Sequence, residues 1–158
     1  MRVLIISDTH GKHQNLIEVA KHLGHLDLCI HLGDGEGYED YIEQILDCPL
    51  KIISGNCDWG SVLEAEQLIE LGEHRIFLTH GHGYYCSRGM EELIRKGKSV
   101  GADTVMYGHT HIPMIKKEEV LLINPGSISK PRQEGRRPSY IVLDVDKMGQ
   151  THYSLNYL

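Results

Sequence analysis

The sequence predicts an α/β fold with parallel strands in its first half. Short apolar runs rich in Val, Ile and Leu alternate there with segments whose apolar residues recur at helical spacing. Short polar motifs directly follow most of these runs. At 158 residues the chain is long enough for a hydrophobic core of its own, so we expect a single domain over residues 1–158.

The first half contains the elements of this prediction in order. Apolar runs predict strands at residues 2–7, 26–32 and 51–54. One helix carries apolar residues from Leu16 to Leu23 and stops at Gly24, and a second covers residues 38–46 before Pro49. This alternation implies parallel strands joined by right-handed crossovers, with a site beyond the carboxyl ends of the strands.

The second half predicts further strands and one helix. Gly72-Glu73 separates apolar runs at 67–71 and 74–79, which is typical of a β-hairpin. A helix is predicted over residues 89–101, and a polar loop rich in Arg and Pro over residues 126–138. The remaining strands are predicted at residues 104–107, 114–117, 120–123, 140–144 and 152–157.

Composition argues against several classes of function. The 16 Lys and Arg against 22 Asp and Glu give a net charge of −6, so we do not expect nucleic acid as a partner. No apolar stretch approaches the length of a membrane span, so we expect no membrane partner. The four cysteines have no CxxC spacing, which argues against a structural zinc knuckle. We predict a cytoplasmic protein with free thiols, since the first apolar run is too short for a signal peptide.

Seven polar residues in five short motifs are the candidate functional site. They combine two carboxylates, one amide and four imidazoles, contributed by Asp8, His10, Asp34, Asn56, His80, His109 and His111. These donors are too many for one metal ion. They suit two ions that share a bridging carboxylate, and such two-metal sites hydrolyse phosphate esters.

The motifs resemble those of the calcineurin-like metallophosphoesterases. The matching segments occur in family order: Ser7-Asp8-Thr9-His10, Leu32-Gly33-Asp34, Gly55-Asn56-x-Asp58, Thr79-His80-Gly81-His82, Gly108-His109-Thr110-His111 and Asn124-Pro125-Gly126-Ser127. More narrowly, the chain is similar to the small bacterial and archaeal phosphodiesterase branch, to which the retromer subunit of eukaryotes is related. The resemblance implies a four-layer αββα sandwich, with two mixed β-sheets face to face and helices outside.

The resemblance also implies a ligand set and a mechanism. One ion would be held by Asp8, His10, Asp34 and His111, and the other by Asp34, Asn56, His80 and His109, so that Asp34 bridges. The ions would make the cluster positive, bind a phosphate anion and lower the pKa of a bridging water, whose hydroxide attacks phosphorus in line. Manganese is favoured, with iron, nickel, cobalt and zinc as alternatives, because mixed nitrogen and oxygen ligands suit all of them.

Four residues beside or among the ligands are weaker candidates for the chemistry. Asn56 is a candidate phosphate contact. Cys57 takes the position of a histidine that many superfamily members use as leaving-group acid; a thiol is a poor substitute, and a packing role is favoured for it. We therefore expect slow turnover of substrates with poor leaving groups. Asp58 is expected to orient a loop by hydrogen bonding, and His82 to support the ligands or face the substrate.

Some other residues near the motifs allow two interpretations. Trp59 either lines the cleft or packs in the core. The basic residues of loop 126–138 either guide an anionic substrate or are solvated. Ser127 is expected to shape the wall of the site and not to act as a nucleophile. His31, inside a predicted strand, is expected to be buried and hydrogen-bonded.

The predicted function is hydrolysis of a small phosphodiester by a metal-dependent enzyme. A phosphomonoesterase, including a protein phosphatase, is the first alternative. A non-catalytic, retromer-like protein-binding scaffold ranks lower because every ligand position is intact, and a nuclease ranks lower because the chain lacks a basic face. The resemblance to the small branch favours a homo-oligomer, a dimer or a tetramer.

Overall fold

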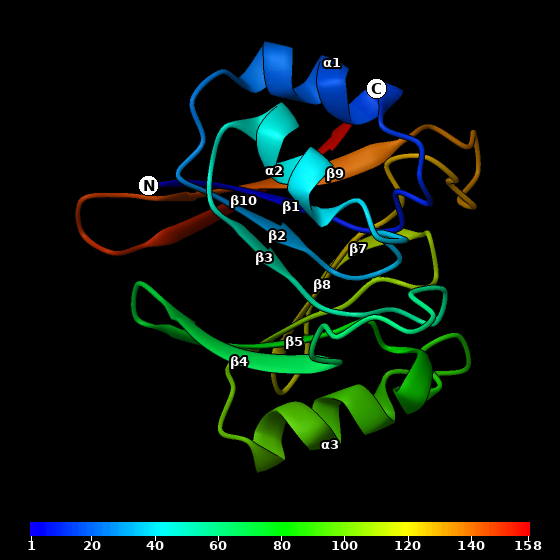
Figure 1. The fold of residues 1–158 in the computed structure, drawn as a ribbon. Helices are drawn as coiled ribbons and strands as arrows, with labels where there is room; N and C mark the ends of the chain where they lie inside the picture. The colour runs from blue at the N-terminus through cyan, green and yellow to red at the C-terminus, as the bar shows by residue number, and fades with distance from the viewer.

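The computed structural model describes all residues, 1–158, as two five-stranded β-sheets packed face to face between helices (Figure 1). Helices α1 and α2 cover the outer face of one sheet, and α3 covers the outer face of the other. The expected four-layer αββα sandwich is confirmed. None of the helices is long and apolar enough to cross a membrane.

The first sheet has the strand order β10-β9-β1-β2-β3. Its parallel part consists of β1 (Arg2–Ile6), β2 (Leu28–His31) and β3 (Leu50–Ile52), which are connected by α1 (Gln14–Leu23) and α2 (Glu39–Leu46). The parallel strands predicted from the strand–helix alternation are confirmed. The strand β2 begins two residues later and ends one residue earlier than expected, and β3 ends two residues earlier, because the pairing with neighbouring strands covers only these residues.

Two antiparallel strands extend the first sheet on its other side. β9 (Ser139–Val145) pairs with β1, and β10 (Thr151–Tyr157) pairs with β9 over its whole length. Both strands were expected from the sequence. The turn between them lies at the left end of the sheet in Figure 1, opposite the loops that follow β1 and β2.

The second sheet has the strand order β4-β5-β6-β8-β7. Its strands are β4 (Glu66–Leu71), β5 (His74–Thr79), β6 (Thr104–Met106), β7 (Pro113–Lys117) and β8 (Leu121–Pro125). The β4–β5 hairpin predicted around Gly72-Glu73 is confirmed, and β5, β6 and β8 pair in parallel.

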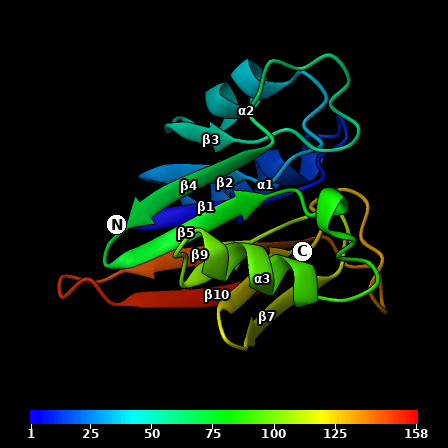
Figure 2. The same cartoon turned by 90° about the horizontal axis from the view of Figure 1, so that it is seen from below.

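Two helical segments lie between β5 and β6. The 3₁₀-helix η1 (His82–Tyr84) follows β5 directly, and α3 (Glu91–Ser99) comes after it. Figure 2 shows α3 lying across the outer face of the second sheet. The helix begins two residues later than expected, and Leu93 and Gly97 are its buried positions.

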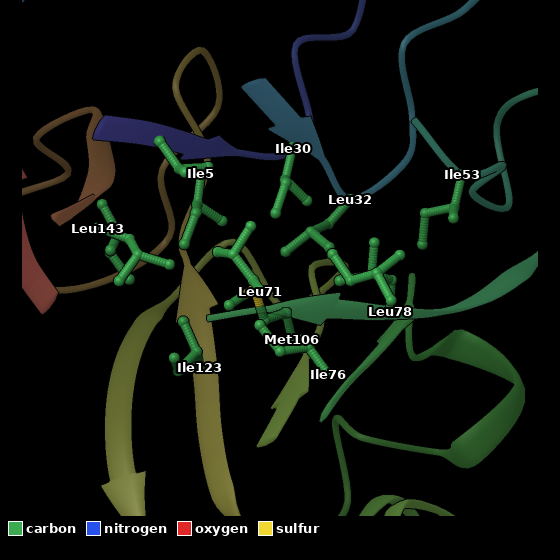
Figure 3. Packing of buried hydrophobic residues seen from close by; sticks show 13 residues of the cluster. Ile5, Ile30, Leu32, Ile53, Leu71, Ile76, Leu78, Met106, Ile123 and Leu143 are labelled. Atoms are coloured by element: carbon green, nitrogen blue, oxygen red, sulfur yellow. The ribbon is translucent and has the colours of Figure 1, made fainter. Parts of the chain in front are cut away.

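The layer between the two sheets is the main hydrophobic core. Side chains alternate along β1, so Val3 and Ile5 enter this core while Leu4 and Ile6 pack beneath α1 and α2. Figure 3 shows Ile5 and Ile76, one from each sheet, within the 13-residue cluster. Because β1, β2 and β3 are parallel, the loops after them emerge at one end of the sandwich.

Candidate metal centre

The seven predicted ligands come together at the end of the sandwich where the parallel strands of both sheets end. They lie in the loops that follow β1, β2, β3, β5 and β6. Four of the side chains are buried, namely those of Asp8, Asp34, His80 and His111. Asn56 is exposed and His10 and His109 are half-buried, so the cluster has a solvent-facing side.

One group of donors surrounds the carboxylate of Asp8. Nε2 of His111 lies 3.0 Å from Oδ1 of Asp8, and Nε2 of His10 lies 3.8 Å from the same oxygen. The two imidazole nitrogens are themselves 3.4 Å apart. These three ligand atoms are close enough to hold one ion.

A second group surrounds the carboxylate of Asp34. Nε2 of His80 lies 3.5 Å from Oδ2 of Asp34 and 3.1 Å from Oδ1 of Asn56. Nδ1 of His109 lies 2.8 Å from the same Asn56 oxygen. Asp34, His80, Asn56 and His109 thus form a connected second set of donors.

Both carboxylates lie between the two groups. Oδ2 of Asp34 is 3.7 Å from Nε2 of His10, besides its approach to His80. Oδ1 of Asp8 is 3.9 Å from Nε2 of His80, besides its approach to His111. The geometry therefore makes Asp8 as central as Asp34, which the sequence alone did not indicate.

The donor set fits divalent transition metals. Oδ1 of Asp8 is fully buried and receives no hydrogen bond, although imidazole nitrogens lie around it. A buried carboxylate oxygen without a partner is costly unless a cation neutralises it. Imidazole nitrogen together with carboxylate and amide oxygen is a donor mixture that suits manganese, iron, cobalt, nickel or zinc.

Hydrogen bonds to backbone carbonyl oxygens orient two of the histidines. Nδ1 of His80 donates to the carbonyl oxygen of Leu32 at 2.6 Å, and Nδ1 of His111 donates to the carbonyl oxygen of Lys130 at 2.6 Å. Since a carbonyl oxygen only accepts, each Nδ1 carries the proton and each Nε2 is free to bind a metal. Such contacts behind the ligands raise their basicity and hold the rings in place.

Glu36 is a residue of the site that sequence reasoning missed. Its Oε1 lies 2.8 Å from Nδ1 of His10, where it can accept the ring proton as the carbonyl oxygens do for the other histidines. The sequence does contain a signal, because Glu36 stands between two glycines directly after Asp34. Glu36 adopts a positive φ of 58°, which turns its side chain back toward His10.

Most of the ligands adopt a backbone conformation that L-residues avoid. Five of the seven have positive φ angles, between 46° and 64°: Asp8, His10, Asp34, His109 and His111. Such conformations persist only where the surrounding structure compensates for their strain, and they cluster at functional sites. The loops are therefore shaped to direct these side chains inward.

Two glycines allow the loops to approach one another. A Cβ atom on Gly55 would overlap Oδ1 of Asp34, and a Cβ atom on Gly108 would overlap Oγ of Ser7. The Cβ position on Gly108 also lies 3.0 Å from Oδ2 of Asp8. These positions exclude any side chain because the Asp34 carboxylate and the Ser7 hydroxyl occupy the space.

Asp58 forms hydrogen bonds with the backbone of two loops. Its carboxylate accepts the backbone N–H groups of Asp34 at 2.8 Å, Glu36 at 2.6 Å and Gly55 at 2.6 Å. The first two belong to the loop after β2, and the third belongs to the loop after β3. Asp58 thus joins two ligand loops without pointing into the cluster.

The site keeps its carboxylates ionised. Burial raises the pKa of Asp8 and of Asp34, but the adjacent imidazoles of His111 and His80 outweigh burial and hold both pKa values below their usual range. Burial lowers the pKa of His80, but the carboxylates of Asp34 and Asp8 raise it above its usual value. The centre therefore stabilises positive charge, and a metal ion would replace the proton.

The weaker candidates occupy different places. The Cys57 side chain is half-buried beside the cluster and does not belong to the hydrophobic core. Burial and the charge of Asp34 raise the pKa of Cys57 to about 11. His82 is exposed, with its ring centre 5.5 Å from that of His80 and 6.0 Å from that of His109. This position agrees with a role facing the substrate.

The loop between β8 and β9 forms another wall of the site. Ser127 is buried, and its hydroxyl donates a hydrogen bond to the backbone oxygen of Asp8 at 2.9 Å. This bond holds the loop against the segment that carries Asp8. Nη1 of Arg132 lies 3.5 Å from the backbone oxygen of His109, so its charge is close to the cluster. Arg137 instead donates to the backbone oxygen of Leu158 at 2.9 Å. Of these two arginines, only Arg132 lies beside the ligands.

Comparisons with known proteins agree with this geometry. Residues 1–148 match the Calcineurin-like phosphoesterase superfamily domain. The chain is 36% identical over 156 residues to the probable metallophosphoesterase YsnB of Bacillus subtilis, covering 96% of this chain and 88% of that protein. It is 31% identical over 172 residues to the phosphodiesterase YfcE of Escherichia coli, covering 92% and 89% respectively.

Solved structures have the same architecture. A protein of Streptococcus pneumoniae described as a predicted phosphoesterase superposes with a TM-score of 0.81 at 28% identity, covering 99% of this chain and 88% of that one. Vps29 of Entamoeba histolytica, complexed with Zn²⁺, superposes with a TM-score of 0.78 at 21% identity, covering 99% of each chain. The latter similarity shows the fold alone. The resemblance predicted from the motifs is confirmed.

Proposed function

This chain belongs to the calcineurin-like phosphoesterase superfamily and is a metal-dependent phosphoester hydrolase, and we propose that its substrate is a small phosphodiester. One observation carries the proposal. Two groups of imidazole and amide donors surround two buried carboxylates, and Oδ1 of Asp8 has no hydrogen-bond partner. The similarity to a phosphodiesterase, YfcE, supports a diester over a monoester.

We propose two ions with a shared set of ligands. Asp8, His10, Asp34 and His111 would hold one ion, and Asp34, Asn56, His80 and His109 would hold the other. Asp34 remains the proposed bridge, because its Oδ2 lies 3.7 Å from Nε2 of His10 and 3.5 Å from Nε2 of His80. We propose manganese as the metal. The homo-oligomer and the cytoplasmic location stay predictions.

Two ions in this site would supply the positive charge that binds the phosphoryl oxygens and would acidify a water molecule as nucleophile. The chain itself provides orientation and charge. Asn56 is exposed beside His80 and His109, so its amide can also contact a phosphate oxygen. Arg132 adds a cation next to His109, which favours an anionic group on that side.

At position 57 the chain offers no group matched to protonating a leaving alkoxide. Cys57 stands beside Asp34, to whose Oδ1 its backbone N–H donates at 2.8 Å. Burial and Asp34 raise the pKa of its thiol to about 11, so the thiol holds its proton at neutral pH. General acids work best when their pKa is near the working pH. We therefore propose that diesters with acidic leaving groups are the better substrates.

The test is hydrolysis of bis-p-nitrophenyl phosphate beside p-nitrophenyl phosphate, after chelation and re-addition of Mn, Ni, Co, Zn and Mg one at a time. We expect metal-dependent cleavage that favours the diester. A preference for the monoester would replace this proposal with a phosphomonoesterase. A folded protein without activity in any metal would favour the protein-binding scaffold.

Two variants make the assay specific to the site. His80→Ala removes a buried donor and should abolish activity, while the exposed His22 of α1 serves as the matched control in His22→Ala. Equal activity of the two variants would exclude the proposed site.

A further inference from the structure

The largest cavity of the molecule adjoins the metal centre. It has a volume of about 920 Å³ and is lined by two segments, 36–39 and 57–63. The first segment leads into α2, and the second belongs to the long loop between β3 and β4. We call it the Trp59 cavity, after its largest side chain.

The Trp59 cavity shares two walls with the ligand cluster. Glu36 lines the cavity, and its Oε1 contacts Nδ1 of His10 at 2.8 Å. Cys57 lines it as well, and its backbone N–H donates to Oδ1 of Asp34 at 2.8 Å. A molecule whose phosphoryl group lies at the cluster can therefore place a substituent in the cavity.

The cavity presents apolar side chains that the fold does not use. Trp59 is 91% exposed and Val62 is 100% exposed, so neither contributes to the hydrophobic core. Trp59 therefore lines the cleft, which decides between the two interpretations that the sequence left open. An indole ring in this position offers a face on which another aromatic ring can stack.

The charge of the cavity excludes anions. Its lining includes the carboxyl groups of Glu36, Glu39 and Asp58 and contains no Lys, Arg or His. Asp58 is neutralised in part by three backbone N–H groups, whereas Glu39 has no cation among the lining residues. The Arg132 guanidinium instead lies beside the backbone oxygen of His109. The side of the centre that faces the Trp59 cavity is therefore negative, and the side next to His109 carries a positive charge.

We propose that the Trp59 cavity binds one of the two esterified alcohols of the substrate, and that this alcohol carries an aromatic ring and no negative charge. This inference rests on the proposed phosphodiesterase function and narrows its substrate class. The ring stacks on Trp59, while the carboxylates of the cavity reject a second phosphate or a carboxylate on that group. An aryl alcohol and a nucleoside share this chemistry.

The first experiment measures binding without catalysis. Trp59 is the only tryptophan of the chain, so its fluorescence reports the cavity alone. The metal-loaded protein is titrated with 4-nitrobenzyl alcohol and with 4-nitrobenzoate, two nitroaromatic quenchers that differ in charge. We expect saturable quenching by the alcohol and at least tenfold weaker binding of the anion. Linear quenching of equal slope by both compounds, which is collisional, would overturn the proposal.

The second experiment separates binding from turnover. We expect Trp59→Ala to raise KM for bis-p-nitrophenyl phosphate at least about fivefold, the factor that roughly 1 kcal/mol of stacking supplies. The value of kcat should change little, and Trp59→Phe should restore most of the KM. Met148→Ala is the control, because Met148 is also exposed, at 78%, but lies in the β9–β10 turn. An unchanged KM in Trp59→Ala would overturn the proposal while the phosphodiesterase function stands.

Two substrates distinguish the sources of the aromatic group. The p-nitrophenyl ester of thymidine 5′-phosphate carries a nucleoside, and methyl p-nitrophenyl phosphate, the reference, carries only one aromatic ring. The rise in KM caused by Trp59→Ala is compared between the thymidine ester and bis-p-nitrophenyl phosphate. A larger rise for the thymidine ester identifies a nucleoside, and a larger rise for bis-p-nitrophenyl phosphate identifies an aryl alcohol. Absence of any hydrolysis by the wild-type protein is a different result, because it would overturn the proposed phosphodiesterase function itself.

Discussion

The carboxylate of Asp58 accepts the backbone N–H of the metal-ligand candidate Asp34 at 2.8 Å. It also accepts the N–H of Gly55, which precedes Asn56 in the next loop. One side chain therefore sets the relative position of two loops that deliver candidate ligands. Removing the Asp58 carboxylate would leave the candidate ligands in the chain but would change the distances between them.

We expect Asp58→Asn to weaken metal binding by about 10–100-fold, the usual loss when a group behind metal ligands is removed. The neutral amide keeps one acceptor oxygen but loses the charge that holds three N–H groups. The measurement is a metal titration followed by activity. Asp40→Asn is the control, since Asp40 is exposed in the first turn of α2. Wild-type metal affinity in Asp58→Asn would show that the loops hold their positions without this carboxylate.

We expect Gly108→Ala to lose activity and metal binding. The added Cβ would overlap Oγ of Ser7 and would lie 3.0 Å from Oδ2 of Asp8, so either the loop or the carboxylate must move. Displacements of this size strongly reduce rates that depend on positioning. Gly83→Ala is the matched control because its Cβ would meet no atom within 4 Å. Similar losses in both variants would mean that the close approach of Gly108 is not the cause.

We expect chelation to lower the melting temperature. The buried carboxylates of Asp8 and Asp34 repel each other when no cation lies between them, and a metal that binds only the folded state stabilises it. At about 100-fold excess of metal over Kd the gain is about 3 kcal/mol, which corresponds to about 5–10 °C for a chain of this size. Calorimetry with and without chelator measures it. The shift should shrink in His111→Ala, and an equal shift there would contradict the proposed ligand.

We expect the protein to lose stability as pH falls from 6.5 to about 4, through His31. Burial lowers the pKa of His31 from 6.5 to about 4. Nδ1 of His31 accepts the N–H of Gly33 at 3.2 Å, so the folded state requires the neutral ring. Between the two pKa values the unfolded chain binds a proton that the folded chain does not, and the loss is on the order of 3 kcal/mol.

Urea unfolding of the chelated protein across this pH range checks the His31 prediction. His31→Asn keeps an acceptor for the N–H of Gly33 but does not titrate, so its stability should depend less on pH than that of the wild type. The carboxyl groups of Asp8 and Asp34 add to the loss only below about pH 5, because above that pH they are ionised in both the folded and the unfolded chain. Parallel pH profiles of the two proteins would assign the effect to other groups.

We expect aryl phosphodiesters to be cleaved much faster than alkyl phosphodiesters. The chain lacks a histidine at position 57, and the pKa of the Cys57 thiol is about 11. Cys57→His should then raise the rate on alkyl diesters by at least about 100-fold, the lower end of general acid catalysis, with little gain on aryl diesters. Steady-state kinetics on both substrates measures the ratio. Equal wild-type rates on aryl and alkyl diesters would contradict the prediction.

Much of the fold and of the candidate site was predictable from local pattern. Apolar runs followed by Asp8, Asp34 and Asn56 placed these residues beyond the carboxyl ends of parallel strands, and the structure has them there. The stop of α1 at Gly24 and the β4–β5 hairpin also follow from local signals. The boundaries of β2 and β3 were less predictable, because a strand ends where its partner stops pairing with it.

The sequence by itself determined the candidate donors and the strand ends from which they come, because residue type and strand periodicity are local properties. Only the tertiary structure decided that Asp8 is as central as Asp34, that Glu36 contacts His10, and that Trp59 lines a cavity beside the site. His10 and His111 lie 101 residues apart in the chain, yet their ring nitrogens are 3.4 Å apart. Such distances depend on how the two sheets pack across their shared core, and no local pattern encodes that packing.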